Sequence, residues 1–397
     1  MDTGASGIGA SYQAYLPLAH ELGLDSQLVL ATPYIGIFRQ GRIHLLHLDH
    51  LIWSGLTTRL LSVGAKLKVW RLVVDLIRAS RRGQLNFTDL EHAAPLDTET
   101  AQCYALRDLN PELEAYLCSP IVRTMLIAET SEISKVELFS GLANIFSSRV
   151  YALLGGLAQF PQALAARLDV ALRTKVTRVA ERGDKVVVES TDSTVDGSSG
   201  TARFDACVIA CPLPVAARIC PDRSALLNPI NGGLSYTQAI TVAVGTRIPP
   251  RTPAFLVQMP AIEDEDLALL FVEHNKAPDL VPAGHGLIGC DWSANSSARW
   301  FEQTDEAIVA RTLKTIEKVF PELAGQVDFT HVTRWRHALP CTKTGAYGLI
   351  AAFNAGLDPA SRIQFAGDYM SGAGQNTAVE FGNRAAAALL NQHRLIH

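Results

Sequence analysis

The C-terminal part of the chain carries the pattern that most restricts its fold. An apolar run over residues 363–366 predicts a buried strand, and Gly367 and Asp368 follow it directly. A glycine-rich loop over residues 371–376 then leads into a predicted helix over residues 377–390. In open α/β sheets, ligands bind outside the carboxyl ends of the strands, and Asp368 is expected at such an end. The pattern therefore predicts an α/β domain with a ligand site at the start of its last helix.

The residue types after this strand suit a cofactor that carries hydroxyls and carbonyls. The carboxylate of Asp368 can accept hydrogen bonds from a sugar or ribityl hydroxyl. The backbone N–H groups of the loop and the positive end of the helix dipole suit an electron-rich carbonyl or a reduced flavin anion. Gly382 and the run Ala385–Ala388 allow close packing of the helix on a sheet. The same residues would also form an ordinary turn and helix cap in any other α/β enzyme.

Composition and charge exclude several classes of protein. The chain has 397 residues, of which 48% are hydrophobic and 19% are charged, and its formal net charge is −4. This length predicts roughly two or three domains, and the apolar content excludes a disordered chain. The near-neutral charge argues against a nucleic-acid partner. No secretory signal and no uncharged apolar run of about 18 residues are visible, so we expect a cytoplasmic location, with peripheral membrane contact as an extension.

Helical and strand patterns alternate along the rest of the chain. Two short apolar strands flank the turn dipeptide Gln40-Gly41, which predicts a hairpin. Apolar spacing and cap residues predict helices over residues 12–22, 51–82, 100–150, 161–168 and 304–320, strands over 175–189 and 206–210, and an antiparallel sheet over 236–295. Within residues 100–150, the pair Asn110-Pro111 is a helix-entry signal. Because helices and strands interleave, the domains are expected to be discontinuous. The seven scattered cysteines predict reduced thiols, and no metal site is expected.

One of the helical segments is strongly basic. Between Arg59 and Arg82 it carries seven basic residues against a single acidic one, Asp75. Two interpretations follow: residues 59–82 contact a membrane surface and give access to a lipophilic substrate, or they form a half-buried helix with a solvated basic face. The second arrangement is the commoner one and is favoured. The apolar stripe of this segment recurs every three or four residues and consists of Leu60, Val63, Leu67, Trp70, Val74 and Ile77.

Taken in order, five segments resemble the FAD-dependent amine oxidase superfamily, which includes protoporphyrinogen oxidases, carotenoid desaturases and monoamine oxidases. Residues 363–390 resemble its C-terminal flavin-binding signature. The other four segments are Asp2-Thr-Gly-Ala5, Gly155–Pro161 with Leu164, residues 176–212, and Trp335–Pro340 with Gly345. The last of these resembles the protoporphyrinogen-oxidase-like branch.

The resemblance implies the fold class. It implies a Rossmann-like FAD/NAD(P)-binding α/β domain and an interleaved α+β substrate domain. The FAD-binding domain would cover residues 1–35, 150–235 and 338–397, and the substrate-binding domain would cover residues 36–149 and 236–337.

The resemblance also implies which residues would hold FAD. Carried over by position, the backbone of Val176 would hold the adenine side, and Gly367 and Asp368 would contact the ribityl–pyrophosphate region. The other implied cofactor residues are Thr3 and Gly4 near the isoalloxazine ring, and Asn376, Thr377 and Ala378 at its pyrimidine edge. For each of them the alternative is a turn or helix-cap role.

The sequence departs from the family pattern at its N-terminus. In the family, a strand–GxGxxG–helix–strand unit precedes the segment that residues 2–5 resemble, and such a unit needs at least roughly 30 residues. The FAD-binding domain is therefore expected to be N-terminally incomplete, without the glycine loop that grips the pyrophosphate. The alternatives are a true start upstream of Met1, a truncated gene, and a relative that binds no flavin.

The implied chemistry is the removal of hydride from a C–H or C–N bond by the flavin. No side chain declares itself as the catalytic base, and Lys343 and Tyr347 are weak candidates. Candidate substrate residues are Thr342, Tyr347 and Lys276, each of which is otherwise an ordinary loop or surface residue. The aromatic residue that amine oxidases place after the proline of this loop is Thr342 here, which argues against amine oxidation.

We therefore predict an FAD-dependent oxidoreductase that removes hydride from a bulky apolar substrate. The apolar composition and the basic segment favour a porphyrinogen-, polyene- or terpenoid-like molecule, as in protoporphyrinogen oxidases or desaturases. One alternative is a flavin-free or truncated relative that acts as a binding or scaffold protein, and the second is an amine oxidase.

Overall fold

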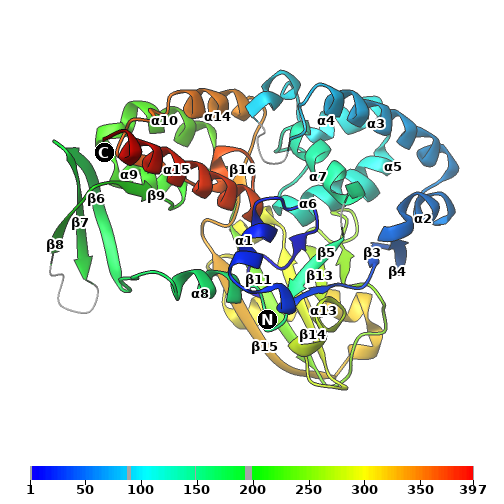
Figure 1. The fold of residues 1–397 in the computed structure, drawn as a ribbon. Helices are drawn as coiled ribbons and strands as arrows, with labels where there is room; N and C mark the ends of the chain where they lie inside the picture. The colour runs from blue at the N-terminus through cyan, green and yellow to red at the C-terminus, as the bar shows by residue number, and fades with distance from the viewer. Residues whose placement is uncertain (1, 87–90, 148, 193–198, 397) are drawn as a thin grey trace.

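The computed structural model describes residues 2–86, 91–147, 149–192 and 199–396. Its architecture is mixed α/β, which confirms the predicted fold class. Three parts can be followed in Figure 1: a large sheet, a group of helices beside it, and a small parallel strand pair with its own helices and a β-meander. The chain passes between these parts repeatedly. The domain boundaries proposed from the sequence stay a prediction.

The large sheet has seven strands in the order β15-β11-β14-β13-β12-β3-β4. Neighbouring strands are antiparallel except β12 and β3, which are parallel. The predicted hairpin is confirmed, because β3 and β4 pair across a turn in which Gln40 and Gly41 both have positive φ. The strand bounds are β3 (Tyr34–Arg39), β4 (Arg42–His47), β11 (Ala239–Thr246), β12 (Leu256–Gln258), β13 (Leu267–Val272), β14 (Gly286–Trp292) and β15 (Val327–Trp335).

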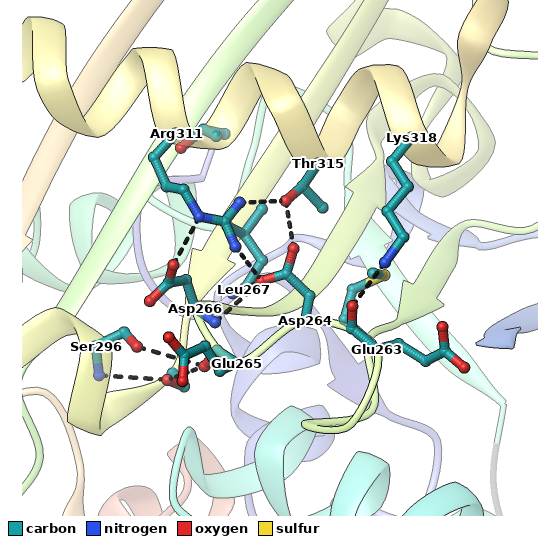
Figure 2. Close-up of polar contacts among 12 residues, drawn as sticks. Glu263, Asp264, Glu265, Asp266, Leu267, Ser296, Arg311, Thr315 and Lys318 are labelled. Atoms are coloured by element: carbon teal, nitrogen blue, oxygen red, sulfur yellow. Dashed lines mark hydrogen bonds and ion pairs between the residues drawn. The ribbon is translucent and has the colours of Figure 1, made fainter. Parts of the chain in front are cut away.

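A cluster of charged residues fastens helix α13 (Asp305–Val319) to this sheet, as Figure 2 shows. Arg311 contacts the carboxylates of Asp264 and Asp266, just before β13, at 2.6 Å each. Thr315, one turn along the helix, donates a further hydrogen bond to Asp264. Burial opposes the ionisation of Asp264, but the bonds from Thr315 and the backbone and the charge of Arg311 together hold its pKa below the usual range. The cluster is therefore ionised.

The group of helices beside the sheet is joined to it through α6. Arg123 on α6 is fully buried and donates hydrogen bonds to the carbonyls of Met259 and Asp264 at 3.0 and 2.9 Å. At the predicted helix entry, the side chain of Asn110 caps α5 by accepting the N–H of Leu113 at 2.8 Å. The helices of this group are α2 (Leu51–Thr57), α3 (Val63–Arg81), α4 (Ala101–Asp108), α5 (Pro111–Leu113), α6 (Ser119–Leu126) and α7 (Lys135–Ser147).

The third part contains the C-terminal strand on which the sequence argument began. Strands β9 (Cys207–Ile209) and β17 (Ile363–Phe365) pair in parallel, and β17 is buried. They lie beside helices α9 (Leu213–Ile219), α10 (Ser224–Gly233), α14 (Ala346–Ala355) and α15 (Gln375–Ile396) and the meander β6 (Thr174–Arg182), β7 (Lys185–Asp192) and β8 (Ser199–Phe204). The remaining elements are β1 (Ile8–Gly9), α1 (Tyr15–Glu21), β2 (Leu28–Leu30), β5 (Val150–Leu153), α8 (Gln159–Ala165), β10 (Ser235–Tyr236), α11 (Glu273–Lys276), α12 (Ala294–Trp300) and β16 (Pro340–Cys341).

Most element bounds agree with the sequence prediction to within a few residues, with four differences. The stretch predicted as helical over residues 100–150 contains the separate helices α4 to α7, and β5 begins at Val150. The predicted helix over residues 51–82 is two helices, α2 and α3. They are separated because Ser62 caps the start of α3 by accepting the N–H of Ala65 at 3.2 Å. The helix predicted over 161–168 begins two residues earlier as α8, and α15 extends beyond Leu390. Within the described residues, no helix is both long and apolar enough to cross a membrane.

Helix α3 is half-buried, but through a different side from the predicted stripe. The side chains that face the core are Ala65, Leu72, Leu76 and Ala79. Of the predicted stripe, Val63, Leu67 and Trp70 are 76%, 75% and 70% exposed. The helix therefore has two apolar sides, one packed and one in solvent.

Candidate active site

A cavity of about 220 Å³ lies between the start of α15 and the group of helices. One wall is formed by residues 372–377 and by residues 11–13, just before α1. The opposite wall comes from residues 85–86, from the end of α6, and from α7. The cavity thus joins the predicted ligand-binding loop to the group of helices, which are remote from it in the sequence.

Glu137 of α7 lines this cavity and is fixed by hydroxyl groups from the first turn of α14 and from the loop before it. Tyr347 donates a hydrogen bond to its Oε1 at 2.7 Å, and Thr342 donates another to the same oxygen. All three side chains are buried. Two of the predicted substrate residues, Thr342 and Tyr347, therefore contact a residue of the cavity wall without lining the cavity themselves.

The Glu137 carboxyl group keeps its proton more tightly than an exposed carboxyl group does. Burial raises its pKa to about 7, the hydrogen bond from Tyr347 works against this rise, and the nearby charge of Asp97 adds to it. Asp97 itself accepts the backbone N–H groups of Gly345 and Tyr347 at 2.8 and 3.0 Å. Among the described residues, the hydroxyl of Ser140, also on the cavity wall, has no hydrogen-bond partner. The cavity wall thus holds a proton-carrying carboxyl group and a buried, unpartnered hydroxyl.

The Gly367-Asp368 pair lies directly after β17, as predicted. Burial raises the pKa of Asp368 to about 6, against the opposing effect of hydrogen bonds from backbone N–H groups that include those of Gly374 and Tyr369. The carboxyl group is therefore held by the glycine loop that leads into α15.

The start of α15 is bound to the start of α1. The side-chain oxygen of Asn376 accepts the backbone N–H groups of Ala14 and Tyr15 at 2.9 and 3.1 Å, so Asn376 caps α1. Asn376 and Thr377 are buried and both line the cavity. Asn376 therefore caps a helix, which was the alternative to its predicted role in cofactor binding, and it also lines the cavity.

The other predicted cofactor residues lie away from this cavity. Thr3 accepts a hydrogen bond through its carbonyl from the indole of Trp335 at 2.6 Å, and Gly4 is exposed beside the same ring. Val176 is half-buried on β6, at an irregularity in its pairing with β7. Ala378 is exposed on α15. Their roles stay predictions.

Of the two predicted lysines, Lys276 is buried and Lys343 is exposed. The ammonium group of Lys276 contacts Asp2 at 3.1 Å and Glu273 at 2.7 Å. Asp2 also accepts the N–H of Leu157 at 2.7 Å, and a side chain at Gly156 (φ +97°) would approach the Asp2 carboxylate. Asp2 therefore joins two of the family-like segments. Lys276, which contacts Asp2, lies outside the cavity wall, as does Lys343.

Glu137 is a candidate site residue that sequence reasoning missed. It is the single charged residue in the largely apolar run Val136–Ile145 of a predicted helix, and an isolated charge in such a run is a signal for a special role. The partners that make it informative, Thr342 and Tyr347, lie more than 200 residues away and could not be assigned to it from the sequence.

Comparison with known families gives one match over almost the whole chain. Residues 1–390 match the family described as flavin containing amine oxidoreductase. No curated protein matches the sequence.

Several solved structures have a similar fold. Cyclohexylamine oxidase from Brevibacterium oxydans IH-35A is 18% identical with a TM-score of 0.74, and the match covers 99% of this chain and 88% of that one. A proposed protoporphyrinogen oxidase from Exiguobacterium sp. 255-15 is 17% identical with a TM-score of 0.72 and the same coverage. A CLA-producing fatty acid isomerase from P. acnes is 12% identical with a TM-score of 0.70, covering 98% of this chain and 86% of that one. At these identities the likeness shows a shared fold.

Proposed function

We propose, from the premise that this chain belongs to the family of flavin-containing amine oxidoreductases, that it oxidises a bulky apolar substrate. The protein is an FAD-dependent oxidoreductase, as that family implies. The finer assignment, a porphyrinogen-, polyene- or terpenoid-like substrate, is our proposal. This proposal rests on the lining of the cavity beside the loop before α15, which has an apolar side and no Lys or Arg among the described residues.

The residues present fit a flavin in their donor chemistry. Asp368 would accept hydrogen bonds from ribityl hydroxyls, and the loop before α15 would present backbone N–H groups, with Thr377 at the first turn of the helix. The unpartnered hydroxyl of Ser140 across the cavity is a donor that a bound molecule would satisfy. When bound, FAD supplies the hydride acceptor. This chain's residues bind and orient the substrate beside it and exclude water.

The cavity wall supports an uncharged substrate. Leu85, Met125 and Leu126 form its apolar side, and no Lys or Arg is present among the described residues that line it. The position at which amine oxidases carry an aromatic residue is Thr342, which is buried and bonded to Glu137. With its pKa at about 7, Glu137 can hold a proton at neutral pH and pass it on, while Tyr347 and Thr342 keep its Oε1 in position.

The carboxyl group of Glu137 in the cavity also favours a second candidate function, that of an amine oxidase. A carboxylate in the cavity would attract a protonated amine, and burial would strengthen that attraction. Glu137→Gln separates the two functions because it keeps the size and hydrogen bonding of the side chain and removes its charge. For an amine substrate we expect KM to rise by more than about tenfold, since a buried charge pair is lost. For an apolar substrate we expect KM to change by less than about threefold.

The experiment follows flavin reduction under anaerobic conditions in the purified protein supplied with FAD. A porphyrinogen and a polyene are compared with a set of primary amines, for the native protein and for Glu137→Gln. Bleaching of the flavin band by the apolar substrates, with KM unaffected by the variant, is the expected result. Reduction by amines alone would overturn the substrate assignment in favour of the second candidate. A protein that takes up no added FAD would instead support a flavin-free binding protein.

We also propose contact with a membrane through residues 59–82, because an apolar substrate would partition into lipid. The exposed side chains Leu67 and Trp70 support this proposal, since they place the predicted apolar stripe of α3 in solvent. The chain segment that follows α3 leads directly to Leu85 on the cavity wall, so such contact would lie close to the site in the sequence.

A further inference from the structure

We infer that a basic pocket at the junction of α2 and α3 binds the headgroup phosphate of an anionic phospholipid and seats this end of the molecule on a bilayer. The inference rests on the membrane contact proposed above and adds to it a specific lipid class and a binding site. Three observations carry it: an exposed apolar surface on two successive helices, a pocket lined by arginines between them, and the charge pattern around both.

The exposed surface, which we call the α2–α3 face, extends beyond the segment that the sequence singled out. Its six large side chains are Ile52, Trp53 and Leu56 of α2 and Val63, Leu67 and Trp70 of α3, each between 61% and 77% exposed. Single exposed apolar residues are ordinary, but a run of this size on neighbouring helices marks an interaction site. Each helix contributes one tryptophan, the residue type that is enriched at the membrane–water interface.

The basic pocket lies between the β3–β4 hairpin, the chain segment that joins α2 to α3, and α5, which contributes Glu112 to its lining. It has a volume of about 540 Å³, and its basic lining residues are Arg39, Arg42, His44 and Arg59. Arg59 follows α2, and Ser62 caps α3, so the pocket occupies the chain between the two halves of the α2–α3 face. Figure 1 shows α2, α3, β3 and β4 together at one end of the molecule.

Part of this pocket is rigid and part is available for a ligand. Arg39 is held by Glu112 at 2.6 Å and lies over the ring of Tyr116 at 4.1 Å. Glu112 also accepts hydrogen bonds from the backbone and hydroxyl of Ser62, so its negative charge is already satisfied. Among the described residues no carboxylate forms an ion pair with Arg42 or Arg59. Two arginines that line one pocket without a carboxylate partner suit a phosphate group by their chemistry, because guanidinium groups donate paired hydrogen bonds to phosphate oxygens.

The charge pattern favours a bilayer over a second copy of the chain. Seven basic residues and one acidic residue lie between Arg59 and Arg82 in a chain whose net charge is −4, so positive charge is concentrated at this end. A symmetric dimer formed through the α2–α3 face would bring the same basic residues against each other. An anionic membrane accepts the apolar side chains and complements the basic residues at once.

The test of the headgroup site uses vesicles and two double variants of equal charge. The full-length protein is mixed with vesicles of phosphatidylcholine, with or without about one-third phosphatidylglycerol, and binding is followed by flotation. The variant Arg42→Gln/Arg59→Gln removes two pocket cations, and Arg81→Gln/Arg82→Gln removes two from the end of α3, outside the pocket. We expect binding to the anionic vesicles, a loss of about thirtyfold for the pocket variant, at about fivefold per cation, and a clearly smaller loss for the control.

Equal losses for the two variants would overturn the headgroup site while leaving the membrane contact standing, because charge would then act without a specific pocket. Binding that is equal on neutral and anionic vesicles would overturn it as well. Inorganic phosphate added at constant ionic strength is expected to leave vesicle binding intact. Complete competition by free phosphate would assign the pocket to a soluble anion and reject the lipid.

The test of the α2–α3 face uses Leu67→Glu/Trp70→Glu, with Leu172→Glu as the control. Leu172 is 78% exposed on another part of the chain, so each substitution adds charge at a position that is already in water. The double variant is expected to lose more than about tenfold in vesicle affinity and the control to lose none. Unchanged vesicle binding by the double variant would show that the α2–α3 face does not contact the membrane, and would overturn the proposed contact through residues 59–82. A native dimer that the double variant converts to a monomer would identify the face as a self-association surface and overturn the inference.

Discussion

Two buried groups of acidic residues in this molecule differ in their partners, and the pKa shifts that result are opposite in direction. In the sheet, Asp264 and Asp266 are paired with Arg311, and the pKa of Asp264 is held below its usual range. At the cavity, the side-chain partners of Glu137 within the described part of the chain are the hydroxyls of Tyr347 and Thr342, and burial raises its pKa to about 7. The first cluster lies between a helix and a sheet, whereas the second opens onto a cavity.

The difference shows which cluster serves structure and which is available for chemistry. A buried carboxylate with a bidentate cation stays charged across the physiological range and acts as a fastening between elements. A buried carboxyl group that has only neutral partners changes its protonation near neutral pH, which is the property of a proton donor or acceptor. The contrast thus assigns Glu137 to the site by physical argument, independently of any resemblance.

The largest expected effect is the loss of Arg311. Arg311→Met leaves Asp264 buried without its paired cation and leaves Asp266 with the exposed Arg299 alone, so we expect a loss of roughly 3–5 kcal/mol in the free energy of unfolding, measured by urea denaturation at pH 7. Arg299→Met is the matched control, because Arg299 also contacts Asp266, at 3.2 Å, but its side chain is 56% exposed. The control should lose less than about 1 kcal/mol. Equal losses would mean that the cluster does not fasten α13 as described.

The next effect is a pH dependence that belongs to Glu137. Its pKa in the folded protein, about 7, lies above the usual 4.5, so the folded state binds the extra proton between these values. The stability is therefore full below about pH 4.5 and falls by about 3 kcal/mol as the pH rises through 7. Unfolding free energies of the native protein and Glu137→Gln, measured from pH 4.5 to 8.5, should converge at the acid end. Curves that stay parallel over the whole range would show that Glu137 does not retain a proton.

The smallest effect concerns the hydroxyl partners of Glu137. Tyr347→Phe removes a hydrogen bond that favours the charged carboxylate, so it should raise the pKa of Glu137 further and destabilise the protein by about 1–2 kcal/mol at pH 8, with a smaller loss at pH 5. Tyr369→Phe is the control, since the buried hydroxyl of Tyr369 has no partner among the described residues. It should change stability little at either pH. A loss for Tyr347→Phe that is independent of pH would assign Tyr347 to packing alone.

Much of the local structure followed from the sequence because it depends on neighbouring residues. The turn at Gln40-Gly41 and the cap at Asn110 were predicted from residue types that favour those backbone geometries, and both are present. The buried strand followed by Gly367 and Asp368 was predicted in the same way. The site was only partly predicted: Asn376 and Thr377 line the cavity, while Glu137 was missed.

The stripe on α3 shows why the rest was out of reach. The spacing of Val63, Leu67 and Trp70 identified one side of a helix, but spacing cannot tell which of two apolar sides meets the core. The core instead takes the side with Ala65 and Leu72, where small side chains let the neighbouring helices approach.

The sequence by itself determined the mixed α/β fold, its flavin-type C-terminal pattern and the local turns and caps, because each depends on residues within one or two turns of backbone. Only the tertiary structure decided which groups meet. It places Glu137 of α7 against Tyr347 of α14, brings Asn376 to the start of α1, and leaves Trp53 and Trp70 in solvent. These outcomes depend on how remote elements pack, and packing depends on the shape of the whole core, which no local pattern encodes.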